Sequence, residues 1–229
     1  MNKRMGSHGF RPAKGSSYTG PGEYLTITPE KDPSIVARHV ERYETAVALV
    51  TNQRGLGGRW LDCACGTGYG SKAVLDVGEE YWGVDRNAQA IAAARQSYGV
   101  GTKTGARFMQ VDIRAVRRWL PGLGPFDAIL SIETLEHLPC ELQALWIAVA
   151  ARNLTADGVM IVACPLGQDV KSEYNRYHVF EPTLCTLGLL LGSAFERVSI
   201  KTQTYVDTAD HGAVQAMAVC LRPKAKDDD

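Results

Sequence analysis

A short apolar run that breaks into alternating glycines is the feature that most constrains the fold of this chain. Residues 60–71 read WLDCACGTGYGS, with glycines at positions 66, 68 and 70. The pattern predicts a strand, a tight turn and a helix start, because glycines let a ligand approach the backbone and a helix N-terminus offers it unpaired N–H groups. A second predicted strand, residues 81–85, ends in Asp85 about 20 residues further on. A carboxylate there suits a ribose diol, so the two strands together predict a nucleoside-binding site.

The order of the glycines separates this site from a dinucleotide site. A dinucleotide fingerprint reads G-x-G-x-x-G, whereas here Asp62 precedes the run C-G-T-G-Y-G. This arrangement resembles motif I of the class I S-adenosylmethionine (SAM) dependent methyltransferases. The resemblance covers about residues 33–221 and implies SAM as the cofactor. It also implies that Asp62 holds the ammonium of SAM directly or through water, and that Asp85 binds the ribose hydroxyls.

Further cofactor contacts follow from the same resemblance. The segment HVERY at residues 39–43 is similar to an H-x-x-R-Y segment in many bacterial members, in which the arginine pairs with the methionine carboxylate. An ordinary surface arginine is the competing interpretation of Arg42. Asp112 is expected to accept from the adenine amino group, or else to be a plain helix N-cap. The full predicted set is Arg42, Asp62, Ala64, Gly66, Gly68, Asp85, Arg86, Asp112, Ile113 and Ser131.

Strand and helix patterns alternate from Trp60 onward, which predicts parallel strands with right-handed crossovers. Segments 196–203 and 213–221 alternate like strands and form the expected terminal hairpin. The fold class is therefore α/β, a Rossmann-like, doubly wound sheet of seven mostly parallel strands with a C-terminal antiparallel hairpin. We expect a flexible arm over residues 1–32, the methyltransferase domain over 33–221 and a charged tail over 222–229. A predicted helix over 33–52 is expected to act with the arm as a lid.

The composition of the chain limits the partners that the protein is expected to bind and the compartment in which it is expected to work. The chain has 25 Lys plus Arg and 25 Asp plus Glu, so its overall charge does not favour nucleic acid or an anionic membrane. Its six cysteines lack the spacing of a disulfide framework, and no apolar segment is long enough to cross a bilayer. A soluble, cytoplasmic protein without a membrane partner is expected, whereas the sequence does not predict an oligomeric state.

A cluster of acids and histidines after the fourth predicted strand is the candidate for chemistry. Glu133, Glu136 and His137 are spaced i, i+3 and i+4, so on a helical turn they converge on one point. With His178 they resemble the E-x-x-E-H plus distal His of metal-assisted O-methyltransferases, which implies a divalent cation held by these four residues. Two alternatives stay open: His137 or His178 acts as a metal-free general base, or the residues are structural. The predicted catalytic residues are His137, His178 and Glu133.

The methyl acceptor is less constrained. Residues 131–134 read SIET in place of the Asp/Asn-Pro-Pro-Tyr/Phe motif of exocyclic-amine methyltransferases, which disfavours a base amine. A small-molecule oxygen is the favoured acceptor. The alternatives are an RNA 2′-hydroxyl or a base, the latter through Cys164 as a nucleophile, and a non-catalytic regulator that binds SAM.

Overall fold

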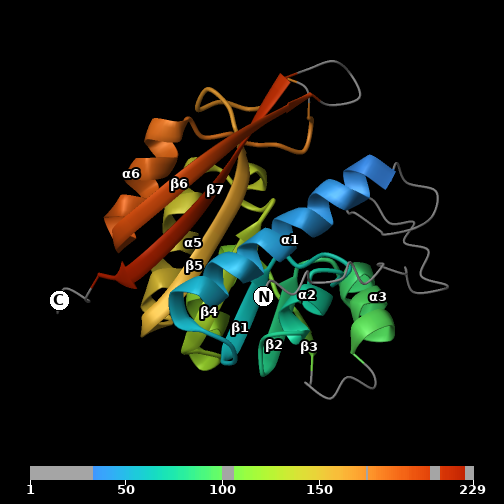
Figure 1. Cartoon of the computed structure of the whole chain (residues 1–229). Helices are drawn as coiled ribbons and strands as arrows, with labels where there is room; N and C mark the ends of the chain where they lie inside the picture. Colours follow the sequence, from blue (N-terminus) through green and yellow to red (C-terminus); the bar gives the residue numbers. More distant parts are fainter. Residues whose placement is uncertain (1–32, 100–105, 174, 207–211, 225–229) are drawn as a thin grey trace, which may run out of the picture.

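The computed structural model describes residues 33–99, 106–173, 175–206 and 212–224. Its centre is a seven-stranded sheet in the order β3-β2-β1-β4-β5-β7-β6 (Figure 1). The first five strands are parallel, and β7 runs antiparallel to both β5 and β6. The predicted fold class is confirmed. The predicted arm, residues 1–32, lies outside the described residues, so the arm and its role as a lid stay predictions.

The strands predicted at residues 81–85, 196–203 and 213–221 all lie within strands of the structure. The strands are β1 (Arg59–Cys63), β2 (Glu80–Asp85), β3 (Arg107–Gln110), β4 (Phe126–Ile132), β5 (Leu154–Leu166), β6 (Phe195–Val206) and β7 (Gly212–Pro223). The α-helices are α1 (Pro33–Arg54), α2 (Ser71–Leu75), α3 (Ala88–Tyr98), α4 (Val116–Trp119), α5 (Cys140–Arg152) and α6 (Leu184–Ala194). Short 3-10 turns are η1 (Ile113–Ala115), η2 (Leu120–Gly122) and η3 (Leu135–His137). None of the described helices is both long and apolar enough for a bilayer span.

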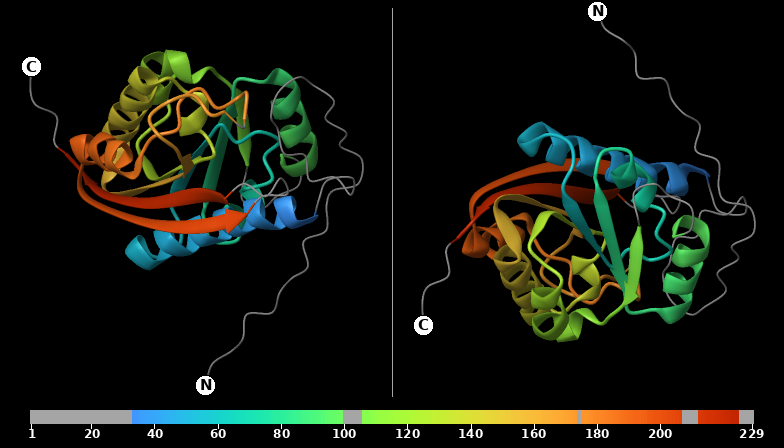
Figure 2. Two further views of the ribbon diagram at one scale, coloured as in Figure 1. Left: turned by 90° about the horizontal axis from the view of Figure 1, so that it is seen from above. Right: turned by 90° about the horizontal axis from the view of Figure 1, so that it is seen from below.

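Helices cover both faces of the sheet, and each face has its own apolar core (Figure 2). Helices α1, α2 and α3 pack on one face, where Val47, Val74 and Ile91 meet the buried side chains of the strands. Helices α4, α5 and α6 pack on the other face through residues such as Trp146 and Leu187. Strands covered on both sides read as continuous apolar runs, which explains why β4 and β5 were easy to recognise in the sequence.

A buried carboxylate joins α1 to the sheet beneath the glycine turn. Asp62 on β1 is fully buried, and its oxygens accept hydrogen bonds from Tyr43 on α1 (3.1 and 3.2 Å) and Tyr81 on β2 (2.7 Å). Burial raises the pKa of Asp62 to about 7, although the two phenolic donors favour its charged form and lower the pKa. Asp62 therefore takes up protons on folding.

This pKa predicts a specific pH dependence of stability. A folded-state pKa above the unfolded value means that the contribution of Asp62 is greatest below about pH 4 and is lost as pH rises towards 7. Urea unfolding of the wild-type chain and of Asp62→Asn should therefore differ with pH. We expect the stability of the wild type relative to the variant to fall by on the order of 2–3 kcal/mol between about pH 5 and about pH 8. A difference that does not change with pH would contradict this assignment.

Candidate active site

A large pocket opens at the carboxyl ends of the parallel strands. Its volume is about 1370 Å³, and its wall includes residues that follow β1, β2, β3, β4 and β5. The chain proceeds in opposite directions from β1 and β4, which are neighbours in the sheet. Open α/β sheets bind ligands at such a switch point. The sequence predicted this location, and the pocket has two chemically different ends.

The glycine turn forms the first end. Ala64, Gly66 and Gly68 have φ angles of 61°, 54° and 77°, in the left-handed region. Ala64 and Gly66 line the pocket. Gly68 instead packs behind it, because a Cβ there would lie 2.7 Å from the Phe108 ring. The turn thus exposes backbone at two positions and uses a glycine at the third for close packing.

Asp85 stands at the end of β2 beside this turn. Its side chain accepts hydrogen bonds from the backbone N–H of Gly66 (3.0 Å) and of Asn87 (2.8 Å). The residue is 5% exposed and lines the pocket. The two loops that follow β1 and β2 are therefore held together by one carboxylate, which also faces the space where a nucleoside would lie.

Two residues predicted to contact the cofactor lie behind the pocket wall. Asp62 is fully buried and reaches the pocket only through Tyr43, whose ring lines it. Ser131 is also fully buried, and its hydroxyl accepts a hydrogen bond from Trp146 Nε1 at 3.1 Å. With Asp62 buried, the prediction that it holds the SAM ammonium directly or through water stays a prediction. Sequence alone does not reveal that two tyrosines cover the carboxylate.

Arg42 and Glu133 form a pair in the pocket. Arg42 Nη1 lies 3.5 Å from Glu133 Oε2, and Gln215 on β7 bridges the two side chains. Gln215 Nε2 donates to Glu133 Oε1 at 2.7 Å. The carboxylate of Glu133 interacts electrostatically with Tyr69 of the glycine turn, so the pair belongs to the same end of the pocket. No sequence pattern pointed to Gln215, which lies 82 residues after Glu133.

The residues after β3 line the adjoining wall. Asp112 caps η1 by accepting from Arg114 N, and both of its oxygens also accept from the Arg114 guanidinium. This pairing lowers the pKa of Asp112, so its carboxylate is charged. Ile113 and Arg86 line the pocket beside it. Asp112 thus has the N-cap geometry that was the competing interpretation, while it also faces the pocket.

The second end of the pocket gathers one acid and two histidines. Ligand atoms of Glu136, His137 and His178 all lie within 4.8 Å of one another. Glu136 is fully buried, and the two imidazole rings meet edge to face with centroids 5.1 Å apart. Glu133 is not in this group. The segment forms a 3-10 turn over Leu135–His137, and Glu133 precedes it with φ 52°, so the predicted convergence of all four residues on a helical turn is corrected.

Backbone contacts bring His178 to His137. The carbonyl of Glu136 accepts from Val179 N at 2.7 Å and from Phe180 N at 3.2 Å. The amide of Gln143 is fully buried and donates to the carbonyls of three residues, Leu135, Leu138 and Phe180. The turn after β4 and the loop after β5 are therefore fastened to each other and to α5.

The hydrogen bonds of the imidazoles define their tautomers. His137 Nδ1 lies 3.0 Å from the Tyr177 carbonyl oxygen, and His178 Nδ1 lies 2.5 Å from Glu181 Oε1. A carbonyl or carboxylate oxygen can only accept, so Nδ1 carries the proton in each neutral ring and the lone pair is on Nε2. Asn175 Nδ2 donates to Nε2 of His178 at 2.9 Å. Two basic nitrogens and a carboxylate can thus hold a cation or accept a proton.

Cys164 lacks the properties of a nucleophile. It is fully buried on β5, and burial raises the pKa of its thiol well above the ordinary value, with Glu136 and Glu133 raising it further. A thiol kept protonated and away from the pocket is inert. This geometry disfavours base methylation through Cys164.

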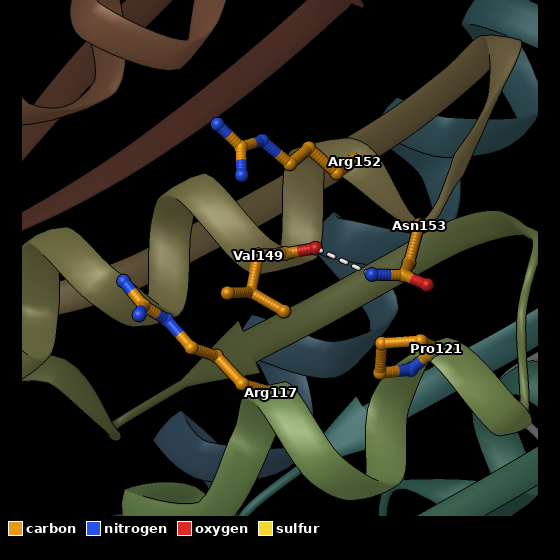
Figure 3. A pocket seen from close by; sticks show the side chains of 5 residues that line it. All are labelled: Arg117, Pro121, Val149, Arg152 and Asn153. Carbon is orange, nitrogen blue, oxygen red and sulfur yellow. Dashed lines mark hydrogen bonds between the residues drawn. The ribbon is translucent and has the colours of Figure 1, made fainter. Parts of the chain in front are cut away.

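A second, smaller hollow lies near the amino ends of β4 and β5 (Figure 3). Its volume is about 450 Å³, and its lining residues are Arg117, Pro121, Val149, Arg152 and Asn153. Asn153 donates to the Val149 carbonyl at 2.7 Å and closes the end of α5. The hollow contains none of the predicted site residues.

Comparison with known proteins agrees with this geometry. A family model described as a methyltransferase domain matches residues 61–158, which include the glycine turn, Asp85, Glu136 and His137. A probable SAM-dependent methyltransferase from Mycolicibacterium smegmatis is 29% identical over 143 residues, 58% of this chain and 50% of that protein. A ubiquinone biosynthesis O-methyltransferase from Colwellia psychrerythraea is 26% identical over 112 residues, 49% of this chain and 43% of that protein. The matches thus span about half the length of these relatives.

Solved structures with a similar fold include two that are named as methyltransferases. Magnesium protoporphyrin IX methyltransferase from Synechocystis, with bound SAM, gives a TM-score of 0.60 at 18% identity and covers 81% of each chain. The N-methyltransferase NodS from Bradyrhizobium japonicum gives 0.61 at 16% identity, with 84% of this chain and 100% of NodS covered. The matched domain, the strand order and the motif at the end of β1 agree. Residues 61–158 thus match a methyltransferase domain, and the relatives together with the strand order support the class I SAM-dependent methyltransferase superfamily.

Proposed function

We propose that this protein is a methyltransferase that moves a methyl group from SAM to an oxygen of a small-molecule acceptor. The observation that carries the proposal is one pocket with two ends. The glycine turn and Asp85 form a nucleoside-binding end, while Glu136, His137 and His178 form an end that can activate a hydroxyl group. The relative named as an O-methyltransferase supports an oxygen acceptor.

The first end has a group for each part of SAM. The exposed backbone at Ala64 and Gly66 admits the nucleoside, and Asp85 accepts from the ribose hydroxyls. Asp112 and Ile113 would contact the adenine. When bound, SAM supplies a methyl group on a positively charged sulfur, which is already a good leaving group. The protein then has to position the acceptor and remove its proton.

Arg42 and Glu133 together suit the amino-acid part of SAM. A guanidinium can pair with the methionine carboxylate, and the neighbouring carboxylate can accept from the ammonium. Because Asp62 is buried, this role passes from Asp62 to Glu133 in our proposal, and Glu133 becomes a cofactor-binding residue instead of a metal ligand. Gln215 holds the pair in place through hydrogen bonds to both partners.

The second end fits a divalent cation. One carboxylate and two imidazole nitrogens within 4.8 Å of one another are suitable donors for such an ion. The hydrogen bonds of both Nδ1 atoms, to the Tyr177 carbonyl and the Glu181 carboxylate, leave the lone pairs on the Nε2 atoms. A bound divalent cation would lower the pKa of an acceptor hydroxyl. Glu136, His137 and His178 would hold the ion, and Leu138 and Leu142 would exclude water. Because both Nε2 lone pairs would then bind the cation, the proton of the acceptor hydroxyl would leave to solvent.

A metal-free base is the second candidate for this end. His178 is oriented by the Glu181 carboxylate in the way that a general base is commonly oriented by an acid. The pair would take the proton of the acceptor hydroxyl without an ion. Removal of metal distinguishes the two mechanisms.

The charges on the pocket wall favour a compact acceptor over a polyanion. Among the described residues, six basic and six acidic side chains line the pocket: Arg38, Arg42, Arg86, Arg114, Lys171 and Arg176, with Asp85, Asp112, Glu133, Glu136, Glu173 and Glu181. Because the two signs balance, the wall lacks the one-sided positive field that draws in nucleic acid. Trp119, Leu138 and Leu142 add apolar surface for a small organic molecule.

Cofactor binding can be tested at Asp85. Asp85→Asn keeps the shape of the side chain but loses the charge-assisted hydrogen bonds to the ribose. We expect calorimetry to give about 10- to 100-fold weaker binding of S-adenosylhomocysteine. Glu196→Gln on the exposed side of β6 is the matched control and should bind as the wild type does. Equal affinities of both variants would remove the ribose role from Asp85.

The Arg42–Glu133 pair makes a more selective prediction. Methylthioadenosine has the nucleoside of SAM but no carboxylate or ammonium. Arg42→Gln and Glu133→Gln should each weaken S-adenosylhomocysteine binding by about tenfold or more and change methylthioadenosine binding by less than about twofold. An equal loss for both ligands would show that the pair supports the fold of the pocket and does not recognise the amino acid.

Chelation tests the metal. SAM turnover is measured with 3,4-dihydroxybenzoate as the probe acceptor, before and after complete removal of metal. We expect activity to fall by about 100-fold or more and to return with added Mg²⁺ or Mn²⁺. Glu136→Gln should need more metal for the same rate. Full activity without metal would exclude the cation and favour the His178 base.

A further inference from the structure

Glu181 lies directly behind His178, on the side of the ring away from the lone pair. We propose that Glu181 is a positioning residue that fixes the tautomer and the orientation of His178, so that Nε2 is presented to a divalent cation. This inference rests on the metal part of the proposed function. The carboxylate Oε1 is 2.5 Å from His178 Nδ1, and the two side chains are only 16% and 14% exposed.

The chemistry of the pair explains its effect on metal binding. An imidazole binds a cation only through an unprotonated nitrogen. Glu181 accepts the Nδ1 proton, so the neutral ring must keep its lone pair on Nε2, the atom that Asn175 Nδ2 now contacts at 2.9 Å. Glu181 therefore acts through His178 and not on the cation itself.

The backbone around Glu181 is built to hold it still. Its N–H donates to the Val170 carbonyl, and its own carbonyl accepts from Asp169 N, both at 3.0 Å, so that residues 170 and 181 form an antiparallel bridge. Gly167 makes room for the side chain, because a Cβ at that position would lie 2.5 Å from Glu181 Cβ and 2.8 Å from Oε2. The next residues start α6, where Thr183 binds the Asp169 carboxylate.

The two histidines have different supports. His137 donates to the neutral Tyr177 carbonyl, whereas His178 donates to a carboxylate. A charged acceptor forms the stronger hydrogen bond. Replacement of Glu181 can therefore disturb His178 and leave the hydrogen bond from His137 to the Tyr177 carbonyl in place.

The test compares Glu181→Gln with the wild type in two measurements on the full chain. The first is the affinity for Co²⁺, titrated alone by calorimetry, for which we expect a 10- to 100-fold loss, about the range for carboxylates that hydrogen-bond to a metal-binding histidine. The second is the tautomer of His178 in metal-free protein, read from two-bond proton–nitrogen correlations. The Gln amide can also donate to Nδ1, so a fraction of the rings should move their proton to Nε2.

Two further variants separate position from charge. Glu196→Gln removes the same charge from the exposed side of β6, outside the pocket wall, and should change Co²⁺ affinity by less than about twofold. Glu181→Asp keeps the charge but withdraws it from His178, so it should weaken Co²⁺ as Glu181→Gln does. Glu181→Asp also decides the matter if thermal melting shows that Glu181→Gln fails to fold.

Each outcome has one interpretation. Loss of Co²⁺ affinity with an altered tautomer supports the inference. Wild-type affinity and an unchanged tautomer in Glu181→Gln overturn it while the metal site stands. Absence of Co²⁺ binding to the wild type overturns both this inference and the metal part of the proposed function, and S-adenosylhomocysteine binding then shows whether the cofactor part survives.

Discussion

The fold of this chain depends on how it keeps one acid inside the protein. Asp62 is fully buried at the end of β1, where an unsatisfied charge would cost several kcal/mol. The hydroxyls of Tyr43 on α1 and Tyr81 on β2 offset this cost by donating hydrogen bonds to the Asp62 carboxylate. As a result, hydrogen bonds link β1, which leads into the glycine turn, to both α1 and β2. Helix α1, whose start is far from the turn in sequence, becomes part of the pocket wall and brings Arg42 with it.

Sequence patterns predicted those parts of the structure that depend on interactions between residues close together in the chain. The apolar strands, the glycine turn and the acid at the end of β2 could all be recognised in the sequence. The conformation of each is decided mainly by residues that are close together in the chain. The residues that could not be predicted interact over long sequence distances. Gln215 meets Glu133 from the far end of the chain, and Gln143 joins two turns through three carbonyls. No periodicity reports such contacts.

The histidine end shows where a sequence pattern misleads. The spacing of Glu133, Glu136 and His137 suits a helix, but the chain leaves β4 through a left-handed residue and then a single 3-10 turn. Glu133 consequently faces the end of the pocket that the glycine turn forms. The cluster consists instead of Glu136, His137 and His178, the last from the loop after β5. Glu133 thus stands between the two halves of the pocket. A side chain that meets both the amino-acid part of SAM and the approach to the histidines can couple cofactor binding to the chemistry.

The pairing of Gln215 with Glu133 also bears on how the protein is made. Arg42 and Glu133 leave the ribosome long before Gln215, and β7 inserts between β5 and β6 only after β6 has been synthesised. A nascent chain can therefore form the glycine turn before β7 has emerged, but the hydrogen bonds of Gln215 to Arg42 and Glu133 form only after β7 has paired with its neighbours. The proposed site for the amino-acid part of SAM is thus completed only when β7 joins the sheet.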